Sequence, residues 1–242
     1  MGAVIRLHVK QPLSAGQMVH LEKGQAHYLF HVMRLRVGDT VLIFDGASGE
    51  WRAEVNEIGK RTGSLLCREQ TKPLLMPPDV WVLFAPIKKA RTDFIVEKAA
   101  EMGARRIVPV ITAFTNAARI QRDRLQAHVI EAVEQCGGTF VPEVTEAAKF
   151  NALFPTFERG RQIMFCDETK LGEPVDDLDR DLKSSPWAIM IGPEGGFSED
   201  ERRRLTHLPQ AHPVSLGPRV LRADTAVVAA MALWQRHFGD WR

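Results

Sequence analysis

The feature that most constrains the fold is an alternation, beyond residue 79, of short apolar runs with segments of helical periodicity. The runs are too short for core helices and suit strands that are buried on both faces. Between the first two runs, Phe94, Ile95, Ala99 and Met102 share one face at helical spacing. Such an alternation predicts an α/β fold with a mainly parallel sheet. The expected strands lie within residues 80–86, 105–111, 162–166, 187–191 and 212–216.

Local signals indicate where the expected helices begin and end. Gly103 and Gly137 follow two segments of helical periodicity, at the place where a glycine caps a helix C-terminus. Ser198 precedes Glu201 by three residues, which is the spacing of a capping box and predicts a helix start. Asp224 stands just before the last apolar helix, where it could serve as the N-cap residue.

The first part of the chain has a different sequence pattern. Within residues 37–55, two β-type runs flank an Asp-Gly and a Ser-Gly turn signal, which indicates a small β-rich domain. Residues 71–79 contain three prolines and resemble a linker. We therefore expect two domains, residues 1–72 and 73–242, with the boundary near Pro73.

Composition bounds the class of protein. A chain of 242 residues that is 45% hydrophobic can bury a sizeable core, and a net charge of +2 does not by itself indicate a nucleic-acid partner. The cysteines Cys67, Cys136 and Cys166 are odd in number and far apart, which argues against a disulfide framework and favours a cytoplasmic location. No secretory leader is expected.

Membrane and metal sites are not expected either. The longest apolar run, residues 226–234, is about half of what a membrane span needs. His27 and His31 have i, i+4 spacing and could share a metal, but no third ligand lies nearby in the sequence.

Two glycine-containing turns follow expected strands and are the candidate ligand site. "IGPEGG", residues 191–196, ends one strand, and "SLGPRVLRADTA", residues 215–226, precedes the last helix. Ligands bind at the carboxyl ends of strands in open α/β sheets. Neither turn matches a phosphate loop or a dinucleotide fingerprint. The first turn alone could equally be a tight turn whose glycines supply positive φ angles, and the second turn favours a ligand site.

These two turns carry a resemblance to a known family. Together with "EKAAEMGARRIVPV", "EAVEQCGGTFVPEV" and "HYLFHVMRLRVGD", they resemble the RsmE family of ribosomal RNA methyltransferases, in the SPOUT superfamily. The resemblance spans nearly the whole chain. It implies a PUA-like, RNA-binding β-barrel followed by a SPOUT-type α/β domain with a mainly parallel sheet and a C-terminal trefoil knot that binds S-adenosylmethionine.

The resemblance also implies an activity and a cofactor. The family transfers a methyl group from S-adenosylmethionine to N3 of one uridine in 16S ribosomal RNA, near the decoding site of the small subunit. No metal is needed for this transfer. The residues that the resemblance assigns to the cofactor are Cys166, Gly192, Pro193, Glu194, Gly195, Leu216, Gly217, Leu221 and Arg222.

Three residues are candidates for catalysis. A cation beside the uracil oxygens would stabilise the uridinate, and we assign this role to Arg222. Asp224 and Glu194 are the candidate proton acceptors. The alternatives are that Asp224 is a helix cap, and that Glu194 is a solvated turn carboxylate or a cofactor contact. The candidate RNA contacts are Arg6, Arg34, Arg36, Lys88, Arg91 and Arg219.

The chain departs from the family pattern at four positions, Ala113, Phe114, Gly138 and Asp224, and two of the departures remove arginines. This keeps alternatives open: an RNA-binding or ribosome-assembly protein without catalysis, a SPOUT methyltransferase with another RNA target, or an α/β enzyme with another nucleotide-like ligand.

The final helix is apolar over residues 226–234, which is more apolar surface than a helix packed on one sheet face needs to bury. This pattern predicts a homodimer built on the C-terminal domain.

Overall fold

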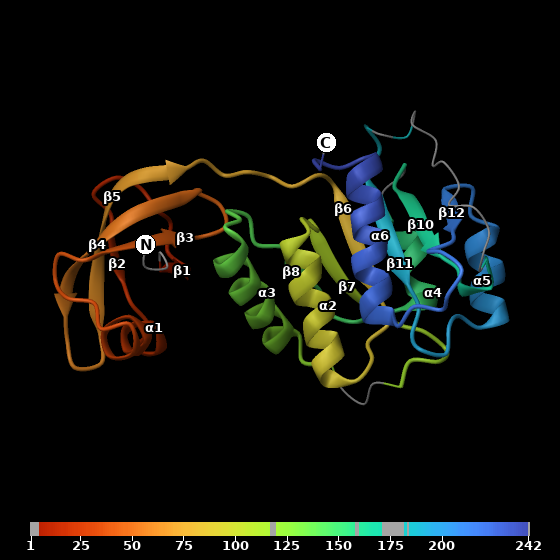
Figure 1. The fold of residues 1–242 in the computed structure, drawn as a ribbon, viewed down its shortest axis with the longest axis horizontal. Coiled ribbons are helices and arrows are strands. Elements are labelled where there is room, and N and C mark those ends of the chain that lie inside the picture. The colour runs from red at the N-terminus through yellow and green to blue at the C-terminus, as the bar shows by residue number, and fades with distance from the viewer. Residues whose placement is uncertain (1–4, 117–119, 158–159, 171–181, 183, 242) are drawn as a thin grey trace. The chain divides into compact units, whose positions relative to one another are not determined.

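The computed structural model describes residues 5–116, 120–157, 160–170, 182 and 184–241. The chain forms two compact units, which we describe separately (Figure 1). The first comprises residues 1–76 with residues 133–141, and the second comprises residues 77–132 and 142–242. Residues 133–141 therefore pack with the first unit, although the sequence analysis placed them in the second domain.

The first unit contains one five-stranded sheet, a short helix and a π-helical turn. Its strands run in the order β1-β3-β4-β5-β2, with β1 parallel to β3 and the other neighbours antiparallel. The elements are β1 (Arg6–His8), β2 (Met18–His20), α1 (Lys23–His27), the π-helix η1 (Tyr28–Val32), β3 (Thr40–Phe44), β4 (Glu50–Ile58) and β5 (Gly63–Lys72).

Alternating burial along the strands builds the core of this unit. On β4, Ala53 and Val55 are fully buried, whereas Arg52 between Trp51 and Ala53 is exposed. This period of two gives the sheet one apolar face, which Leu29 at the π-helix helps to cover. The two β-type runs expected within residues 37–55 are confirmed as β3 and the first part of β4.

A buried arginine on the first strand, Arg6, binds residues 133–138. The Arg6 side chain is 9% exposed, and its Nε donates to the Glu50 carboxylate at 2.6 Å. Its Nη atoms donate to the carbonyl oxygens of Val133, Glu134 and Gly138. These bonds explain why a segment distant in sequence belongs to the first unit.

The second unit is built on a parallel sheet. The strand order is β12-β10-β11-β6-β7-β8, and β9 pairs with β7. All of these pairs are parallel. The strands are β6 (Val80–Phe84), β7 (Arg106–Ile111), β8 (Glu143–Val144), β9 (Ala148–Lys149), β10 (Gln162–Cys166), β11 (Trp187–Ile191) and β12 (Ala211–Val214).

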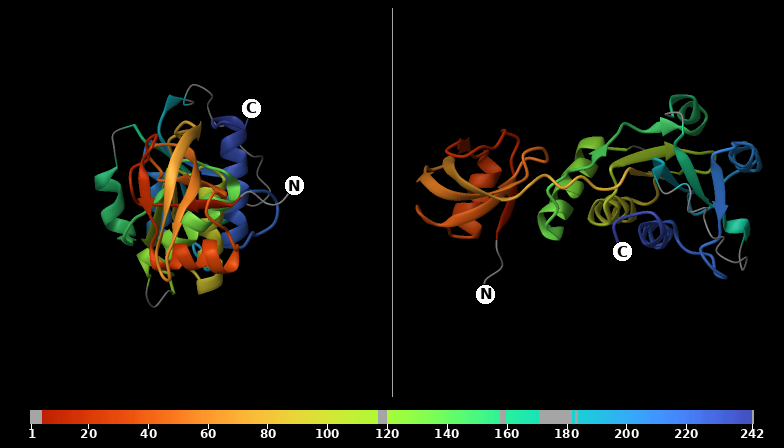
Figure 2. Two further views of the ribbon diagram at one scale, coloured as in Figure 1. Left: turned by 90° about the vertical axis from the view of Figure 1, so that its left-hand side faces the viewer. Right: turned by 90° about the horizontal axis from the view of Figure 1, so that it is seen from above.

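Helices cover both faces of this sheet (Figure 2). On one face, α2 and α6 lie side by side, and the Gln235 amide of α6 donates to the Met102 carbonyl at 2.6 Å. On the other face, Phe150 and Leu205 pack against Phe165 and Met190. The helices are α2 (Lys89–Glu101), α3 (Arg122–Cys136), α4 (Phe150–Leu153), α5 (Glu199–Thr206) and α6 (Ala223–His237), with 3-10 turns η2 (Phe154–Thr156) and η3 (Glu168–Lys170).

The expected α/β architecture is confirmed: the first four apolar runs contain β6, β7, β10 and β11, and the fifth overlaps β12. The capping box is also confirmed, because the Glu201 N–H donates to the Ser198 hydroxyl and the Glu201 carboxylate accepts from the Ser198 N–H. The trefoil knot stays a prediction. Across the described residues, no helix is long and apolar enough to span a membrane.

The N-cap assignment of Asp224 is wrong. Arg222 is the N-cap residue of α6, with extended backbone angles, and its carbonyl accepts the Ala226 N–H at 2.7 Å. Asp224 therefore lies in the first helical turn, where its negative charge still interacts favourably with the helix dipole.

The Arg6–Glu50 pair makes the first unit sensitive to acid. Burial alone would raise the pKa of Glu50, but hydrogen bonds from Thr71 and Arg6 lower it overall. A lowered folded-state pKa contributes stability above the ordinary carboxyl range, and this contribution is lost as the pH falls through the folded-state pKa.

We expect Glu50→Gln to lower the free energy of unfolding at pH 7 by about 3 to 5 kcal/mol, because the buried Arg6 loses its counter-charge. The difference from the parent should shrink as the pH falls below the carboxyl range. Urea unfolding followed by tryptophan fluorescence measures both effects. The control is Glu54→Gln, which removes the partner of the half-exposed Arg68 and should cost about 0 to 1 kcal/mol. An equal cost in the two variants would contradict a role for burial.

Candidate active site

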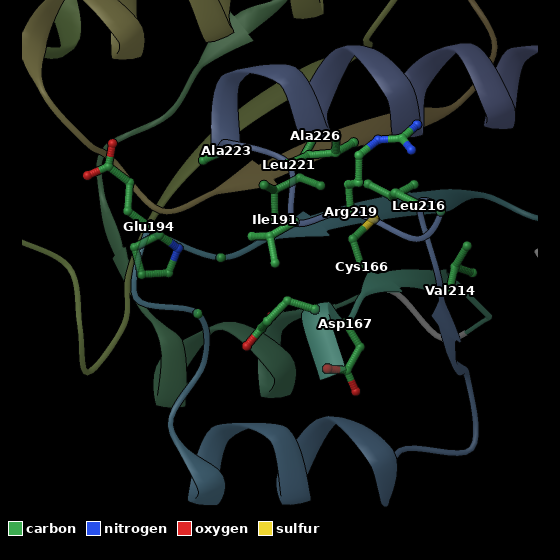
Figure 3. A pocket seen from close by; sticks show the side chains of 16 residues that line it. Cys166, Asp167, Ile191, Glu194, Val214, Leu216, Arg219, Leu221, Ala223 and Ala226 are labelled. Atoms are coloured by element: carbon green, nitrogen blue, oxygen red, sulfur yellow. The ribbon is translucent and has the colours of Figure 1, made fainter. Parts of the chain in front are cut away.

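A pocket opens where β10, β11 and β12 end (Figure 3). It contains about 600 Å³ of empty space, including its open mouth. The lining combines apolar side chains, glycine backbone and carboxylates. The lining residues are Cys166, Asp167, Glu168, Ile191, Gly192, Pro193, Glu194, Gly196, Val214, Leu216, Gly217, Arg219, Val220, Leu221, Ala223 and Ala226.

Parallel pairing explains why these loops meet. β10 lies between β11 and β12, and Cys166 at its end is in register with Val214 at the end of β12. The last pair of β10 with β11 is Phe165 opposite Met190, and each strand ends at the next residue, Cys166 and Ile191. Since all three strands point the same way, their carboxyl ends form one edge, and the following loops surround one space.

The first turn, residues 192–196, requires glycine at two positions. A Cβ on Gly192 would lie 2.9 Å from the Phe197 ring, so the backbone can pack there only without a side chain. Gly196 has a φ of +70°, and the Glu168 carboxylate occupies the space where its Cβ would point. The glycines therefore bring the backbone close to the pocket and to its acidic wall.

The second turn is fixed by a buried serine. Ser215 is 2% exposed, and its hydroxyl accepts the Gly217 N–H at 3.2 Å. Gly217 has a φ of +106°, a backbone conformation that glycine adopts without strain. Leu216 within this turn and Leu221 after it line the pocket together with Ala223 and Ala226 of α6 (Figure 3).

Two carboxylates in the pocket were missed by the sequence analysis. Asp167 and Glu168 directly follow β10, and Asp167 is 7% exposed. Arg202 of α5 contacts both, with Nη2 at 2.7 Å from Glu168 and Nε at 3.3 Å from Asp167. Their position directly after an expected buried strand was the signal that could have identified them.

The Cys166 thiol is not a nucleophile in this environment. Burial strongly raises its pKa, so the thiol stays neutral near pH 7. A neutral thiol acts as a small apolar group, which is how Cys166 contributes to the lining.

One arginine joins both candidate proton acceptors. Arg91 of α2 forms an ion pair with Glu194, and its Nε lies 3.7 Å from the Asp224 carboxylate. The Glu194 side chain is 50% exposed and lines the pocket, whereas that of Asp224 is 19% exposed and does not. Arg91 thus brings the first turn, the start of α6 and α2 together.

Most residues assigned to the cofactor line this pocket, but two do not. Gly195 is absent from the lining, and an added Cβ there would lie 3.5 Å from Phe114 instead. Arg222 is exposed at the start of α6, next to the lining residues Leu221 and Ala223. The pocket brings together Cys166, Gly192, Pro193, Glu194, Leu216, Gly217 and Leu221.

The candidate RNA contacts separate into two groups. Arg34, Arg36, Lys88 and Arg219 are exposed, and Arg91 is partly buried in its ion pairs. Arg6 is not available as an RNA contact, because its guanidinium is buried against Glu50 and three backbone carbonyls. The structure therefore assigns Arg6 to the interior of the first unit.

Two other sequence-based interpretations can be compared with the structure. Lys98 and Glu101 form an i, i+3 ion pair at 2.7 Å, as their spacing suggested. His27 and His31 lie with their ring centroids 5.2 Å apart. Across the described residues, no group of three or more histidines, cysteines or carboxylates could hold a metal ion.

Comparison with known proteins identifies the family to which this architecture belongs. A model of the RNA methyltransferase domain matches residues 75–235, and a model of the RNA methyltransferase PUA domain matches residues 21–65. Two relatives named ribosomal RNA small subunit methyltransferase E come from Rickettsia conorii and a Synechocystis strain. The first is 29% identical, with 94% of this chain and 93% of the relative covered. The second is 33% identical, with 88% of this chain and 71% of the relative covered.

A solved structure shows the same fold. The ribosomal RNA small subunit methyltransferase E from Neisseria gonorrhoeae, crystallised with S-adenosyl methionine, is 25% identical and superposes with a TM-score of 0.84. The match covers 99% of this chain and 100% of that one.

A parallel α/β unit with its pocket at the strand ends, accompanied by a small β-rich unit, is the architecture of an RNA methyltransferase with a PUA-like domain. The chain belongs to this RNA methyltransferase family, and within it to the RsmE group of ribosomal RNA small subunit methyltransferases.

The burial of Cys166 leads to a direct prediction. Iodoacetamide should alkylate Cys166 at least about tenfold more slowly than the exposed Cys136, because the reactive species is the thiolate. Cys67, whose pKa burial also raises, should be slow as well. Peptide mass spectrometry over a time course measures the three rates. Equal labelling of Cys166 and Cys136 would contradict the raised pKa of the Cys166 thiol.

Proposed function

We propose that this protein binds S-adenosylmethionine in the pocket at the ends of β10, β11 and β12 and methylates N3 of a uridine in 16S ribosomal RNA of the small subunit, near the decoding site. The observation that carries the proposal is the pocket itself, in a chain of the RNA methyltransferase family. Supporting it, the structurally similar protein from Neisseria gonorrhoeae was crystallised with S-adenosyl methionine.

The residues of the pocket fit this cofactor. Apolar side chains of Ile191, Leu216 and Leu221 suit the faces of an adenine, and the glycine turns expose backbone N–H and C=O groups to its edge. The cofactor carries positive charge at its sulfonium and its α-ammonium group. Asp167 and Glu168 supply carboxylates on the wall of the pocket that suit these charges and the ribose hydroxyls.

Bound S-adenosylmethionine supplies an activated methyl group, so the protein needs no covalent catalysis. The neutral thiol of Cys166 agrees with this, since a thiolate would compete for the methyl group. What remains for the chain is to align the uracil ring and to promote loss of its N3 proton.

Arg222 is the cation that we assign to the uracil oxygens. Among the described residues it forms no ion pair, it is exposed, and its chain neighbours Leu221 and Ala223 line the pocket. A guanidinium there favours the negative charge that develops when N3 loses its proton. Arg91 cannot take this role in the same way, because Glu194 already pairs with it.

Glu194 is the better of the two candidate proton acceptors. It lines the pocket and is half exposed, so a bound base can reach it. Asp224 lies in the first turn of α6, is more buried and interacts with the helix dipole and Arg91. We therefore propose that Asp224 helps to position Glu194 through Arg91, which contacts both carboxylates.

The homodimer stays a prediction. On α6, Val228, Ala229, Ala232 and Leu233 are only partly buried, and this side of the helix is the surface that the prediction concerns.

The cofactor assignment can be tested by filling the pocket. Leu216→Trp should weaken S-adenosylmethionine binding at least about tenfold, because an indole occupies the space proposed for the adenosine. Isothermal titration measures the affinity. Phe94→Trp, on the exposed part of α2, is the matched control and should bind like the parent. If a folded Leu216→Trp protein also bound like the parent, the pocket would not be the cofactor site.

The role of Arg222 predicts a selective loss of chemistry. Arg222→Ala should slow methyl transfer about 100-fold or more while cofactor affinity stays within a few-fold of the parent, because the charge acts on the transition state. Single-turnover assays with labelled cofactor and small subunits measure the rate. Arg236→Ala, an exposed arginine at the other end of α6, is the control. Near-parental transfer by Arg222→Ala would remove the assignment.

A further inference from the structure

An exposed aromatic side chain lies beside the turn that carries Glu194. Phe114 is 53% exposed, and no other phenylalanine, tyrosine or tryptophan among the described residues is as exposed. A Cβ on Gly195 would lie 3.5 Å from the Cβ of Phe114 and 3.9 Å from its ring atom Cδ2. Phe114 therefore packs on the glycine backbone of this turn, and about half of its surface remains available to a ligand.

The strand order explains why Phe114 lies here. β11, β6 and β7 are consecutive parallel strands, so the loops that follow them begin at the same edge of the sheet. Phe114 is the third residue after the end of β7 at Ile111, and Glu194 is the third residue after the end of β11 at Ile191. Phe114 does not line the pocket, so it lies outside the space proposed for the cofactor.

Hydrogen bonds fix the turn that presents Phe114. The Thr112 N–H donates to the Thr115 hydroxyl at 2.8 Å, and the Thr115 N–H donates to the Thr112 carbonyl at 3.2 Å. The Ala113 N–H donates at 2.7 Å to the carboxylate of Glu201, which is 7% exposed. The same carboxylate accepts the Ser198 N–H, just after the turn that carries Glu194. One buried carboxylate thus holds both loops and limits the movement of Phe114.

Unpaired cations follow on the same edge. Asn116, two residues beyond Phe114, lines a groove together with Lys88 and Lys89 at the start of α2. Both lysines are exposed, and neither forms an ion pair within the described part of the chain. Uncompensated positive charge around a concave surface attracts anions such as the phosphates of a nucleic acid. A strand that contacts Phe114 can therefore continue over these lysines.

The proposed reaction creates a need for an aromatic surface at this place. N3 of uridine lies on the edge that pairs with other bases, and enzymes that modify a base take it out of the stack. A uridine that enters the pocket leaves the neighbouring base without a stacking partner on one side. Aromatic side chains stack on unpaired bases, and Phe114 lies next to the pocket rather than in it. Its position therefore suits the neighbouring base and not the target.

We propose that Phe114 stacks on the nucleobase next to the target uridine and takes the place of the extruded uracil in the stack. Lys88 and Lys89 contact phosphates of the same strand. The inference rests on the proposed function for the identity of the target, and it adds a residue that selects for an unpaired uridine with a stackable neighbour. Phe114 is one of the positions at which this chain departs from the family pattern, so the inference concerns this chain in particular.

Methyl transfer to small subunits from a strain that lacks this protein tests the stacking role. Under single-turnover conditions, the protein is kept in excess and its concentration is varied. Phe114→Ala should raise the half-saturating protein concentration about tenfold, because the neighbouring base loses its stacking surface. The rate at saturation should stay within a few-fold of the parent, and isothermal titration should give parental affinity for S-adenosylmethionine.

A substitution series separates stacking from general apolar contact. Phe114→Tyr and Phe114→Trp keep an aromatic ring and should stay within about threefold of the parent, whereas Phe114→Leu should resemble Phe114→Ala. The matched control is Phe94→Ala, which removes another exposed phenylalanine of the second unit and should behave like the parent. Thermal unfolding verifies that each variant is folded. If Phe114→Ala does not fold, the leucine variant, which keeps apolar contact with Gly195, carries the comparison.

Failure of this inference can be distinguished from failure of the proposed function. A parental half-saturating concentration for folded Phe114→Leu would overturn the stacking role while methyl transfer by the parent keeps the proposed function. If the parent transfers no methyl group, the proposed function falls, and anisotropy of the fluorescently labelled protein titrated with small subunits decides the role of Phe114. Weaker binding by the leucine variant than by the tyrosine variant supports stacking on an RNA base, and equal binding overturns it.

Discussion

The candidate site depends on one constraint: β10 pairs in parallel with both β11 and β12. Because of this pairing, Cys166, Ile191 and Val214 end their strands at one edge of the sheet. The three loops that follow these strands therefore start side by side and surround a common space. The glycines at residues 192 and 196 then let the backbone approach where side chains would block it, and Gly217 supplies a positive φ. The rest of the proposed chemistry depends on this edge.

Two arginines hold the acidic groups of the site in place. Arg202 fixes Asp167 and Glu168 on the wall of the pocket, and Arg91 links Glu194 to Asp224 at its mouth. Such partly buried pairs contribute little to stability, but they restrict where each carboxylate can point. The exposed Arg222 has no such partner among the described residues, which leaves its charge available to a substrate. Arg219, which lines the pocket, is also exposed and has no ion pair among the described residues, so the site separates positioning cations from two unpaired ones.

The sequence predicted the strands and helices well, because apolar runs, glycine caps and the capping box at Ser198 are local signals. It predicted less where the outcome depends on distant contacts. Nothing near Arg6 indicates that Glu50 and the carbonyls after residue 132 bury it, so it was assigned to RNA. Gly195 shares a motif with the pocket glycines, yet faces Phe114 instead. The N-cap of α6 is Arg222, two residues before the predicted Asp224, because Arg222 already has the extended backbone of an N-cap.

The most direct test of the central claim is to identify the methylated nucleoside. Small subunits from a strain that lacks this protein would be incubated with the purified protein and S-adenosylmethionine carrying a deuterated methyl group. The 16S ribosomal RNA would then be digested to nucleosides and analysed by mass spectrometry. The account predicts that the label appears in 3-methyluridine and nowhere else. Label in another nucleoside, or no label with active cofactor and intact subunits, would contradict it.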